Sequence, residues 1–223
     1  MNAPRRYRSA ADLSSVIPVF PLTGVVLLPR ARLPLNIFEP RYMAMVDAAM
    51  AGNRIIGMIQ PKLGDEDLRL PGLADVGCAG RIVEYSETDD GRYLITLYGI
   101  VRFKVAAERD KGTPFRQVVA DYSDFGNDFL EDEPHDFARD RLIAALTPYL
   151  KSRDMRTDWA AIEGAPAETL VNALSMLCPF DAAEKQALLE ARDLKERAQA
   201  LIMLLEMANA ATVPGASGGE QMN

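Results

Sequence analysis

The sequence predicts an α+β fold in which a compact β-barrel or sandwich is followed by a group of packed helices. Two observations predict it. In the first half, short runs rich in Val, Ile, Leu and Tyr are separated by Pro, Gly and Asp, which is typical of short strands joined by turns. In the second half, apolar residues recur at helical spacing. We therefore expect a β subdomain over residues 16–122 and a helical subdomain over residues 134–209.

Seven segments of the first half have strand character. Asp89-Asp90-Gly91 separates two of them and is a good hairpin signal, because Gly adopts the positive φ that tight turns need. One helix interrupts the strands, since Pro40 suits a first helical position and Gly52 can end the helix. The predicted strands are Val16–Phe20, Val25–Leu28, Ile55–Gln60, Gly80–Glu84, Tyr93–Tyr98, Val101–Val105 and Arg116–Tyr122.

An acidic segment joins the two predicted subdomains. Six carboxylates lie between Asp121 and Glu133 without a Lys or Arg, so we interpret residues 123–133 as a solvated linker. Beyond it, apolar stripes cover residues 142–150, 170–178 and 194–208, and Asp181 with Glu184 resembles a capping box at a helix start. Residues 1–15 are expected to be a flexible N-terminus and residues 210–223 a disordered tail.

Composition excludes several classes of protein. The net charge of −7 argues against a general nucleic-acid binder and against adhesion to an anionic membrane surface. No apolar run reaches the roughly 18 residues that a membrane span needs, and no signal peptide is evident, so we expect a cytoplasmic protein. Cys78 and Cys178 are expected to be reduced thiols in the core, with a disulfide as the alternative.

No local motif indicates catalysis. His135 is the sole histidine, so a His-rich zinc site is excluded, although His135 with neighbouring carboxylates could hold a metal ion weakly. The sequence has no phosphate-binding glycine loop, no CxxC or HExxH, and no GxSxG. A Ser-Lys dyad stays open, because six lysines and several serines are present and no motif singles one out. We therefore expect no catalytic residue, no metal and no cofactor.

The segment from Pro18 to Tyr42 resembles the N-terminal domain of Lon proteases. In that family a P-L-x-x-x-V-L-x-P pattern leads into L-x-I-F-E-P-R-Y, and this sequence has Pro21-Leu22, Val26-Leu27 and Pro29, then Leu35 to Tyr42. Further matching segments follow in the family's order. They are Ile56–Met58, Gly77–Ile82, Gly99–Phe103, Pro114–Arg116, Glu184–Glu190 and Leu194–Arg197.

The resemblance covers roughly residues 16–209 and implies a PUA-like β-barrel subdomain followed by an α-helical subdomain. It also implies a role in capturing protein substrates. The Walker A loop of the family's AAA+ ATPase domain and the Ser and Lys of its peptidase domain have no matching positions here. We therefore expect a stand-alone form of the domain that is not an enzyme.

The favoured hypothesis is a module that binds unfolded proteins or exposed apolar protein segments, for substrate capture or as an adaptor, with a full-length Lon protease as a further candidate partner. Candidate partner-binding residues are Phe38, Arg41, Tyr42, Arg92 and Tyr93. For Arg41 the alternative is an ion pair with Glu39 that only holds the helix. The ten methionines would give an adaptable surface or, alternatively, fill the core.

Two other functions stay open. One is an enzyme with a small-molecule site at the junction of the barrel and the helices, where pockets often form. The other is weak RNA binding, because PUA-like folds elsewhere contact RNA. Arg92, Tyr93 and Arg102 could form a basic patch for it, but the net charge of −7 opposes this.

Overall fold

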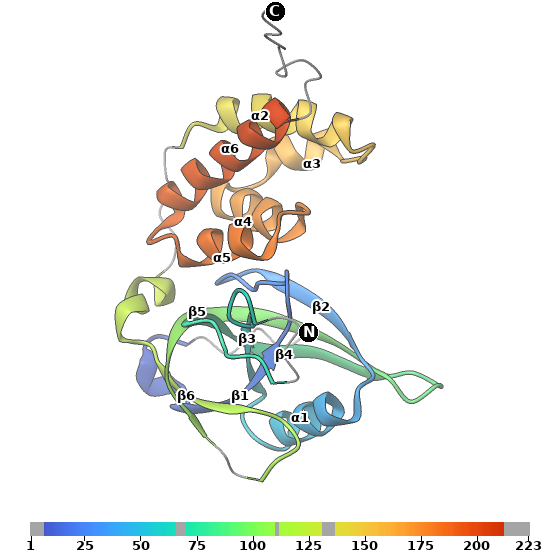
Figure 1. Cartoon of the computed structure of the whole chain (residues 1–223), viewed down its shortest axis with the longest axis vertical. Coiled ribbons are helices and arrows are strands. Elements are labelled where there is room, and N and C mark those ends of the chain that lie inside the picture. Colours follow the sequence, from blue (N-terminus) through green and yellow to red (C-terminus); the bar gives the residue numbers. More distant parts are fainter. Residues whose placement is uncertain (1–6, 66–69, 110–111, 131–136, 212–223) are drawn as a thin grey trace, which may run out of the picture. The chain divides into compact units, whose positions relative to one another are not determined.

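The computed structural model describes residues 7–65, 70–109, 112–130 and 137–211. Tertiary contacts divide the chain into two compact units. The barrel unit comprises residues 1–133 and Met176–Glu190, and the helical unit comprises Pro134–Ser175 and Ala191–Asn223. The strands come first in the chain and most of the helices follow, which confirms the predicted α+β class (Figure 1).

Six strands form the sheet of the barrel unit, in the order β2-β5-β4-β3-β1-β6. The long strand β5 pairs again with β6 at its other end, so the sheet closes on itself as a barrel. β1 and β3 are parallel, and the other pairs are antiparallel. The bounds are β1 Val16–Pro21, β2 Arg32–Ile37, β3 Ile55–Ile59, β4 Val76–Glu87, β5 Tyr93–Arg109 and β6 Gln117–Asp121.

The strand prediction was wrong at two places. Residues 25–28, expected to be a strand, form an irregular segment that buries Val26, Leu27 and Leu28. Conversely, β2 was missed because it contains Pro34, which argues against an ordinary strand. β2 pairs with β5 on one side alone among the described residues, and an edge position of this kind tolerates a proline.

The two predicted strands 93–98 and 101–105 form one continuous strand, β5. The glycine between them allows another backbone segment to come close to this strand. Gly99 lies between them, and a Cβ atom there would stand 2.0 Å from the carbonyl oxygen of Leu28. The Gly99 N–H donates to Ala31 O at 2.9 Å, and its carbonyl accepts from Arg30 N at 2.8 Å. Gly99 therefore marks a contact with the irregular segment rather than a turn.

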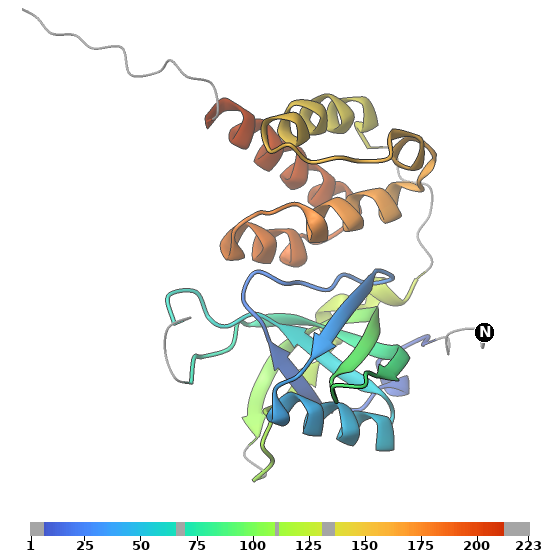
Figure 2. The ribbon, with the colours of Figure 1, turned by 90° about the vertical axis from the view of Figure 1, so that its right-hand side faces the viewer.

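The helix α1, Pro40–Ala51, begins at the predicted proline and ends before Gly52. It buries Tyr42, Met45 and Val46 in the barrel core and lies against the strands in both views (Figures 1 and 2). α1 follows β2 directly, so the end of β2 and the start of this helix form one corner of the barrel unit.

The predicted solvated linker contains ordered structure, so this interpretation was wrong in part. Residues Ser123–Phe129 form a 3-10 helix, η2, and Asp128 is buried against Arg102. The carboxylates from Glu131 to Glu133 lie outside the described residues. Residues 1–15, expected to be flexible, include the short 3-10 helix η1, Ala10–Asp12.

One helix from the second half of the chain belongs to the barrel unit. α5, Ala182–Glu190, adds Leu189 to the barrel core. The Gln60 side chain donates to Gln186 Oε1 at 3.0 Å, and Gln186 Nε2 donates to Val76 O at 3.1 Å. The block that we expected over residues 134–209 is therefore interrupted by residues 176–190, because their buried contacts are with the strands.

The capping box predicted at the start of α5 is present. Asp181 Oδ1 accepts from the Glu184 N–H at 2.8 Å, and Glu184 Oε2 accepts from the Asp181 N–H at 2.8 Å. Each side chain satisfies a backbone donor that the first helical turn leaves without an intrahelical acceptor. The sequence therefore located this helix start correctly.

The helical unit contains α2 Arg139–Ser152, α3 Trp159–Gly164, most of α4 Ala167–Leu177, and α6 Leu194–Ala211. Within it, Asn209 of α6 donates to Ala145 O of α2 at 2.9 Å, and Arg197 of α6 donates to Asn172 Oδ1 of α4 at 3.1 Å. No described helix combines the length and the apolar composition that crossing a bilayer requires.

Candidate functional site

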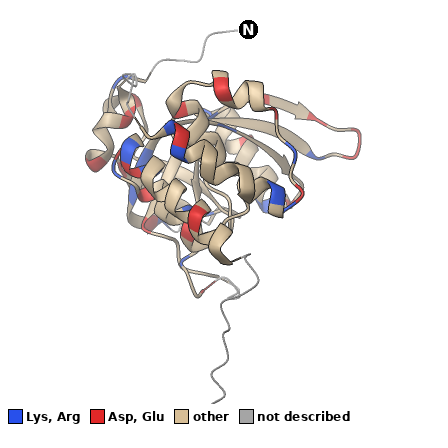
Figure 3. Ribbon diagram, turned by 90° about the horizontal axis from the view of Figure 1, so that it is seen from above, with Lys and Arg blue, Asp and Glu red and all other residues tan. Residues whose placement is uncertain are grey.

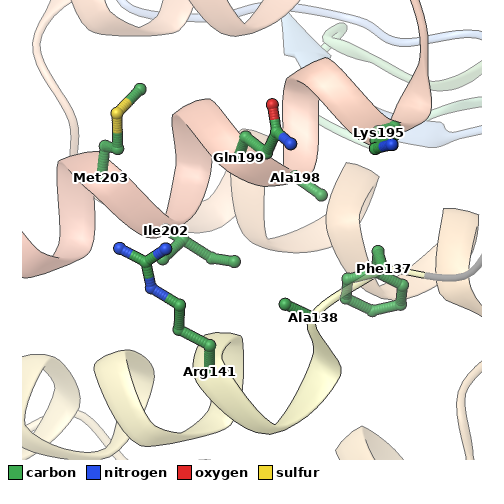
Figure 4. Close-up of a pocket in the computed structure, with 8 residues that line it drawn as sticks. All are labelled: Phe137, Ala138, Arg141, Lys195, Ala198, Gln199, Ile202 and Met203. Atoms are coloured by element: carbon green, nitrogen blue, oxygen red, sulfur yellow. The ribbon is translucent and has the colours of Figure 1, made fainter.

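A cavity of about 530 Å³ opens between α2 and α6 of the helical unit, and we call it the α2–α6 groove (Figure 4). Its volume is within the range of binding pockets in proteins. Phe137, Ala138 and Arg141 line it at the start of α2, and Lys195, Ala198, Gln199, Ile202 and Met203 line it from α6.

Helical periodicity explains which α6 residues face the groove. Residues three and four apart lie on the same helix face, so the sequence from Lys195 to Met203 presents one stripe to α2. Ala198 and Ile202 are 1% and 3% exposed and form the apolar floor. Met203 is 54% exposed and stands on the rim. The groove thus offers an apolar floor with an accessible, deformable thioether above it.

Charged side chains mark the two ends of the groove. Arg141 reaches from α2 toward α6 beside Ile202 and Met203, whereas Lys195 lies at the end near Phe137 (Figure 4). Arg141 donates to both carboxylate oxygens of Glu206, at 2.8 and 2.7 Å. This hydrogen bonding lowers the pKa of Glu206. The pair is exposed, so it contributes little to stability and mainly fixes the position of Arg141.

α2 and α6 run in nearly the same direction past each other. Arg141 bonds to Glu206, and Ala145, one turn further along α2, accepts from Asn209, also about one turn further along α6. Both helix starts therefore lie at the Lys195 end of the groove. The backbone N–H groups of a helix start carry partial positive charge, which adds to the ammonium charge of Lys195 there.

The candidate residues Phe38, Arg41 and Tyr42 lie elsewhere, at the corner of the barrel unit where β2 meets α1. Arg41 forms an ion pair with Glu39 at 2.9 Å, which is the structural alternative considered for it, and lies 4.5 Å from the centre of the Tyr42 ring. Tyr42 packs on Phe20 and is 9% exposed, so its ring offers little surface to a partner. Phe38 is 62% exposed.

Arg92 and Tyr93 lie next to the same corner, at the base of the β4–β5 hairpin. Tyr93 pairs with Ile37, the residue before Phe38. Its hydroxyl bonds to Asp47 of α1, and this bond, with desolvation and the nearby Asp47 charge, raises the pKa of Tyr93 to about 12. Arg92 forms an ion pair with Asp90 at 2.8 Å. The structure therefore gathers all five candidates at one corner of the barrel unit, and none of them lines the α2–α6 groove.

The prediction of a basic patch for RNA binding was wrong for one of its three residues, Arg102, which is buried. Arg102 is 3% exposed and forms an ion pair with Asp128 at 2.8 Å, so its charge is directed into the barrel unit. Seen from above, stretches of Lys and Arg are interspersed with stretches of Asp and Glu on the described ribbon (Figure 3). The described residues therefore show positive and negative side chains mixed along the chain.

Other sequence expectations concern metals and thiols. Cys78 and Cys178 are buried and neither forms a disulfide, as expected. The described residues contain no cluster of three or more His, Cys, Asp or Glu side chains that could hold a metal ion. His135 lies outside the part of the chain that the structure describes.

Sequence reasoning missed the α2–α6 groove. The stripe Leu194, Ala198, Leu201 and Leu205 was interpreted as core, and these residues are indeed buried. The available signal was a second row on the same helix: Met203 and Met207 are four residues apart and are both more than half exposed. Of these two methionines only Met203 lines the groove, so the exposed pair was a partial signal for it.

Known proteins match the chain over most of its length. A curated Lon protease of Parabacteroides distasonis is 31% identical over 209 residues, which cover 86% of this chain and 24% of that protein. The Lon protease of Escherichia coli (strain K12) is 26% identical over 198 residues, which cover 85% of this chain and 24% of that protein. The chain therefore spans about a quarter of the length of these two relatives.

Two solved structures share the fold. The Lon N-terminal domain protein of Xanthomonas campestris superposes with a TM-score of 0.59 at 22% identity, covering 84% of this chain and 97% of that one. The N-terminal domain of the Mycobacterium avium complex Lon protease gives a TM-score of 0.60 at 18% identity, covering 89% and 100%. At such identities the likeness concerns the fold alone.

The sequence model of the family described as the ATP-dependent protease La (LON) substrate-binding domain matches residues 16–207. This match includes the six-stranded barrel and nearly all of the helical elements. It agrees with the resemblance carried by Pro21 to Tyr42 and with the shared fold. The chain therefore belongs to the LON substrate-binding domain family.

Proposed function

We propose that this protein binds unfolded proteins or exposed apolar protein segments through the α2–α6 groove and catalyses no reaction itself. The single observation that carries the proposal is a cavity between two helices of a LON substrate-binding domain, with Ala198 and Ile202 at its floor and the exposed Met203 on its rim. A concave apolar surface with a few polar groups at its edge is typical of sites that bind apolar side chains.

The rim suits partners of varied sequence. Met203 is unbranched and polarisable, so it adapts to side chains of different shape. Gln199 can donate or accept hydrogen bonds with a bound backbone. These groups hold apolar segments without requiring one sequence, which is what capture of many unfolded clients demands.

The proposal extends to the partners and the location of the protein. Clients bound in the groove would be presented to a full-length Lon protease, which makes the protein an adaptor or a substrate-capture module in the cytoplasm. A second contact surface is the corner formed by Phe38, Arg41, Tyr42, Arg92 and Tyr93. The exposed Phe38 ring supports this role, which stays a prediction.

The test is an anisotropy titration of a fluorescent, permanently unfolded protein with the purified full chain. Met203→Lys places a charge on the groove rim, and we expect binding to weaken about tenfold or more, because a buried apolar contact is replaced by a group that must be desolvated. Met207→Lys is the matched control, since Met207 is exposed on the same helix and does not line the groove.

Two results would contradict the proposal. One is absence of binding by the unsubstituted protein over the whole titration. The other is equal weakening by the Met203 and Met207 substitutions, which would indicate a general effect of charge on α6. Circular dichroism spectra and melting temperatures of both variants establish that each remains folded.

A further inference from the structure

We propose that the α2–α6 groove selects client segments in which a carboxylate lies a few residues from an apolar side chain, and that Lys195 binds this carboxylate. The inference rests on the proposed function and adds the substrate class. The supporting observation is that the two charged residues lining the groove are both cations, Arg141 at one end and Lys195 at the other. No Asp or Glu is among the eight lining residues.

The two cations are not equivalent. The Arg141 guanidinium is matched by the Glu206 carboxylate through two hydrogen bonds. Across the described residues, no ion pair involves the Lys195 ammonium, and Lys195 is exposed. A bound carboxylate would therefore meet an unmatched charge at the Lys195 end and an already neutralised one at the Arg141 end.

Acidic residues next to Lys195 in the sequence are directed elsewhere. Asp193 Oδ1 accepts from the Glu196 N–H at 2.8 Å, which caps the start of α6. Glu196 accepts from the Arg192 N–H at 2.6 Å and from Arg192 Nε at 3.1 Å, and these bonds lower the pKa of Glu196. Both carboxylates serve the helix start, and neither lines the groove.

The spacing along α6 sets the register of the bound segment. Ala198 and Ile202 lie three and seven residues after Lys195, which corresponds to about 4.5 and 10 Å along a helix axis. An extended peptide advances about 3.3 Å per residue. A carboxylate two or three residues from an apolar side chain can therefore contact Lys195 while that side chain reaches the floor near Ile202.

The overall charge of the chain makes this preference specific to the groove. At −7 the protein repels acidic segments at long range, and at physiological ionic strength this repulsion is screened beyond about 8 Å. Bulk charge alone would favour basic clients. A preference for acidic segments would thus have to arise from local groups, and among the described residues that line the groove Lys195 is the cation without an ion-pair partner.

The experiment compares two fluorescent apolar peptides of identical sequence, except that Asp or Asn stands three residues before the central Leu-Phe pair. Anisotropy titrations use the full chain at low salt. We expect the Asp peptide to bind about three- to fivefold more tightly than the Asn peptide, as an exposed ion pair allows. Lys195→Gln should abolish the difference, and Lys195→Glu should reverse it.

Lys151→Gln is the matched control, because Lys151 is an exposed cation in the last turn of α2 and does not line the groove. It should leave the Asp preference unchanged.

Equal binding of both peptides, if Met203→Lys weakens it, would overturn the carboxylate selection and leave the proposed function standing. An Asp preference that survives Lys195→Gln would overturn the role of Lys195. Failure of both peptides and of the unfolded protein to bind would overturn the proposed function as well.

Discussion

The guanidinium of Arg102 and the carboxylate of Asp128 form a buried ion pair that joins β5 to η2. Arg102 Nε and Nη2 donate to the two carboxylate oxygens at 2.9 and 2.8 Å, and the Arg102 backbone N–H donates to Asp128 Oδ2 at 2.9 Å. Arg102 Nη1 also donates to Leu189 O of α5 at 3.2 Å. One side chain thus connects three elements of the barrel unit.

Removing one partner of this pair should cost much more than removing an exposed pair. Asp128→Asn leaves the Arg102 charge buried without its counter-ion, and we expect the free energy of unfolding to fall by about 3–5 kcal/mol. Urea denaturation followed by circular dichroism measures it. Arg32→Met, which breaks the exposed pair of Arg32 with Glu84, is the control and should change stability by at most about 1 kcal/mol. Equal losses in both variants would contradict the role given to the buried pair.

Gly99→Ala should destabilise the protein through a steric clash. The added Cβ would stand 2.0 Å from the Leu28 carbonyl oxygen, so the irregular segment or β5 must move. We expect a loss of about 1–3 kcal/mol in the free energy of unfolding. Gly126→Ala is the control, because a Cβ there meets no atom within 4 Å, and it should stay within about 0.5 kcal/mol of the unsubstituted protein. Thermal and urea unfolding measure the loss in each variant, and equal losses would contradict the clash at Gly99.

The hydrogen bond of its hydroxyl to Asp47 raises the pKa of Tyr93 to about 12, so Tyr93 should ionise at higher pH than an ordinary tyrosine. The folded state keeps this proton longer than the unfolded state does. The contribution of the group to stability is therefore complete below about pH 10 and is lost as the pH rises to about 12. The difference in ultraviolet absorbance at high pH between the unsubstituted protein and Tyr93→Phe isolates its titration. Asp47→Asn should shift that titration to lower pH, and an unchanged titration would show that the bond does not hold the proton.

Asp181→Ala should destabilise α5 by removing its N-terminal cap. Its carboxylate accepts from the Glu184 N–H at 2.8 Å, and loss of such a cap costs typically about 1 kcal/mol. Limited proteolysis within residues 182–190 should accelerate accordingly. Asp89→Ala is a suitable comparison, because Asp89 is exposed in the β4–β5 hairpin and caps no helix. Similar proteolysis rates in the two variants would argue against the capping contribution.

Local signals in the sequence predicted the elements whose causes are local. Three such signals are the proline at the start of α1, the glycine after its end and the capping box at Asp181. Each acts within a few residues, so it can be recognised in the sequence without knowledge of the fold. Runs of β-branched residues likewise identified β1, β3 and β6 within one or two residues of their ends.

Errors arose where the cause is a distant partner. The sequence predicted a solvated Asp128 because its neighbours are acidic, yet its partner Arg102 lies 26 residues away. The grouping of α5 with the strands depends on contacts such as that between Gln60 and Gln186, which are 126 residues apart. β2 contains a proline that only its edge position accommodates, and that position depends on the topology of the whole sheet.

The α2–α6 groove could not be predicted from the sequence for the same reason, because it depends on residues that are distant in the chain. Periodicity identified α2 and α6 and the face of each that is buried. It could not reveal that the start of α2 lies beside residues 195–203, because nothing local specifies which two helices become neighbours. The exposed row of Met203 and Met207 was a partial signal, but its meaning depends on the groove next to it.

The position of α5 in the barrel unit has a consequence for synthesis on the ribosome. All six strands are complete by residue 121, but Leu189 of the core and the Gln186 partner of Gln60 are translated only about 65 residues later. For several seconds the nascent barrel would expose the apolar surface that α5 later covers, an open seam in its core. During this time Gln60 would lack its Gln186 partner. A fragment ending at residue 133 would retain that seam permanently, so chaperone contact and aggregation should concentrate in the interval before α5 emerges.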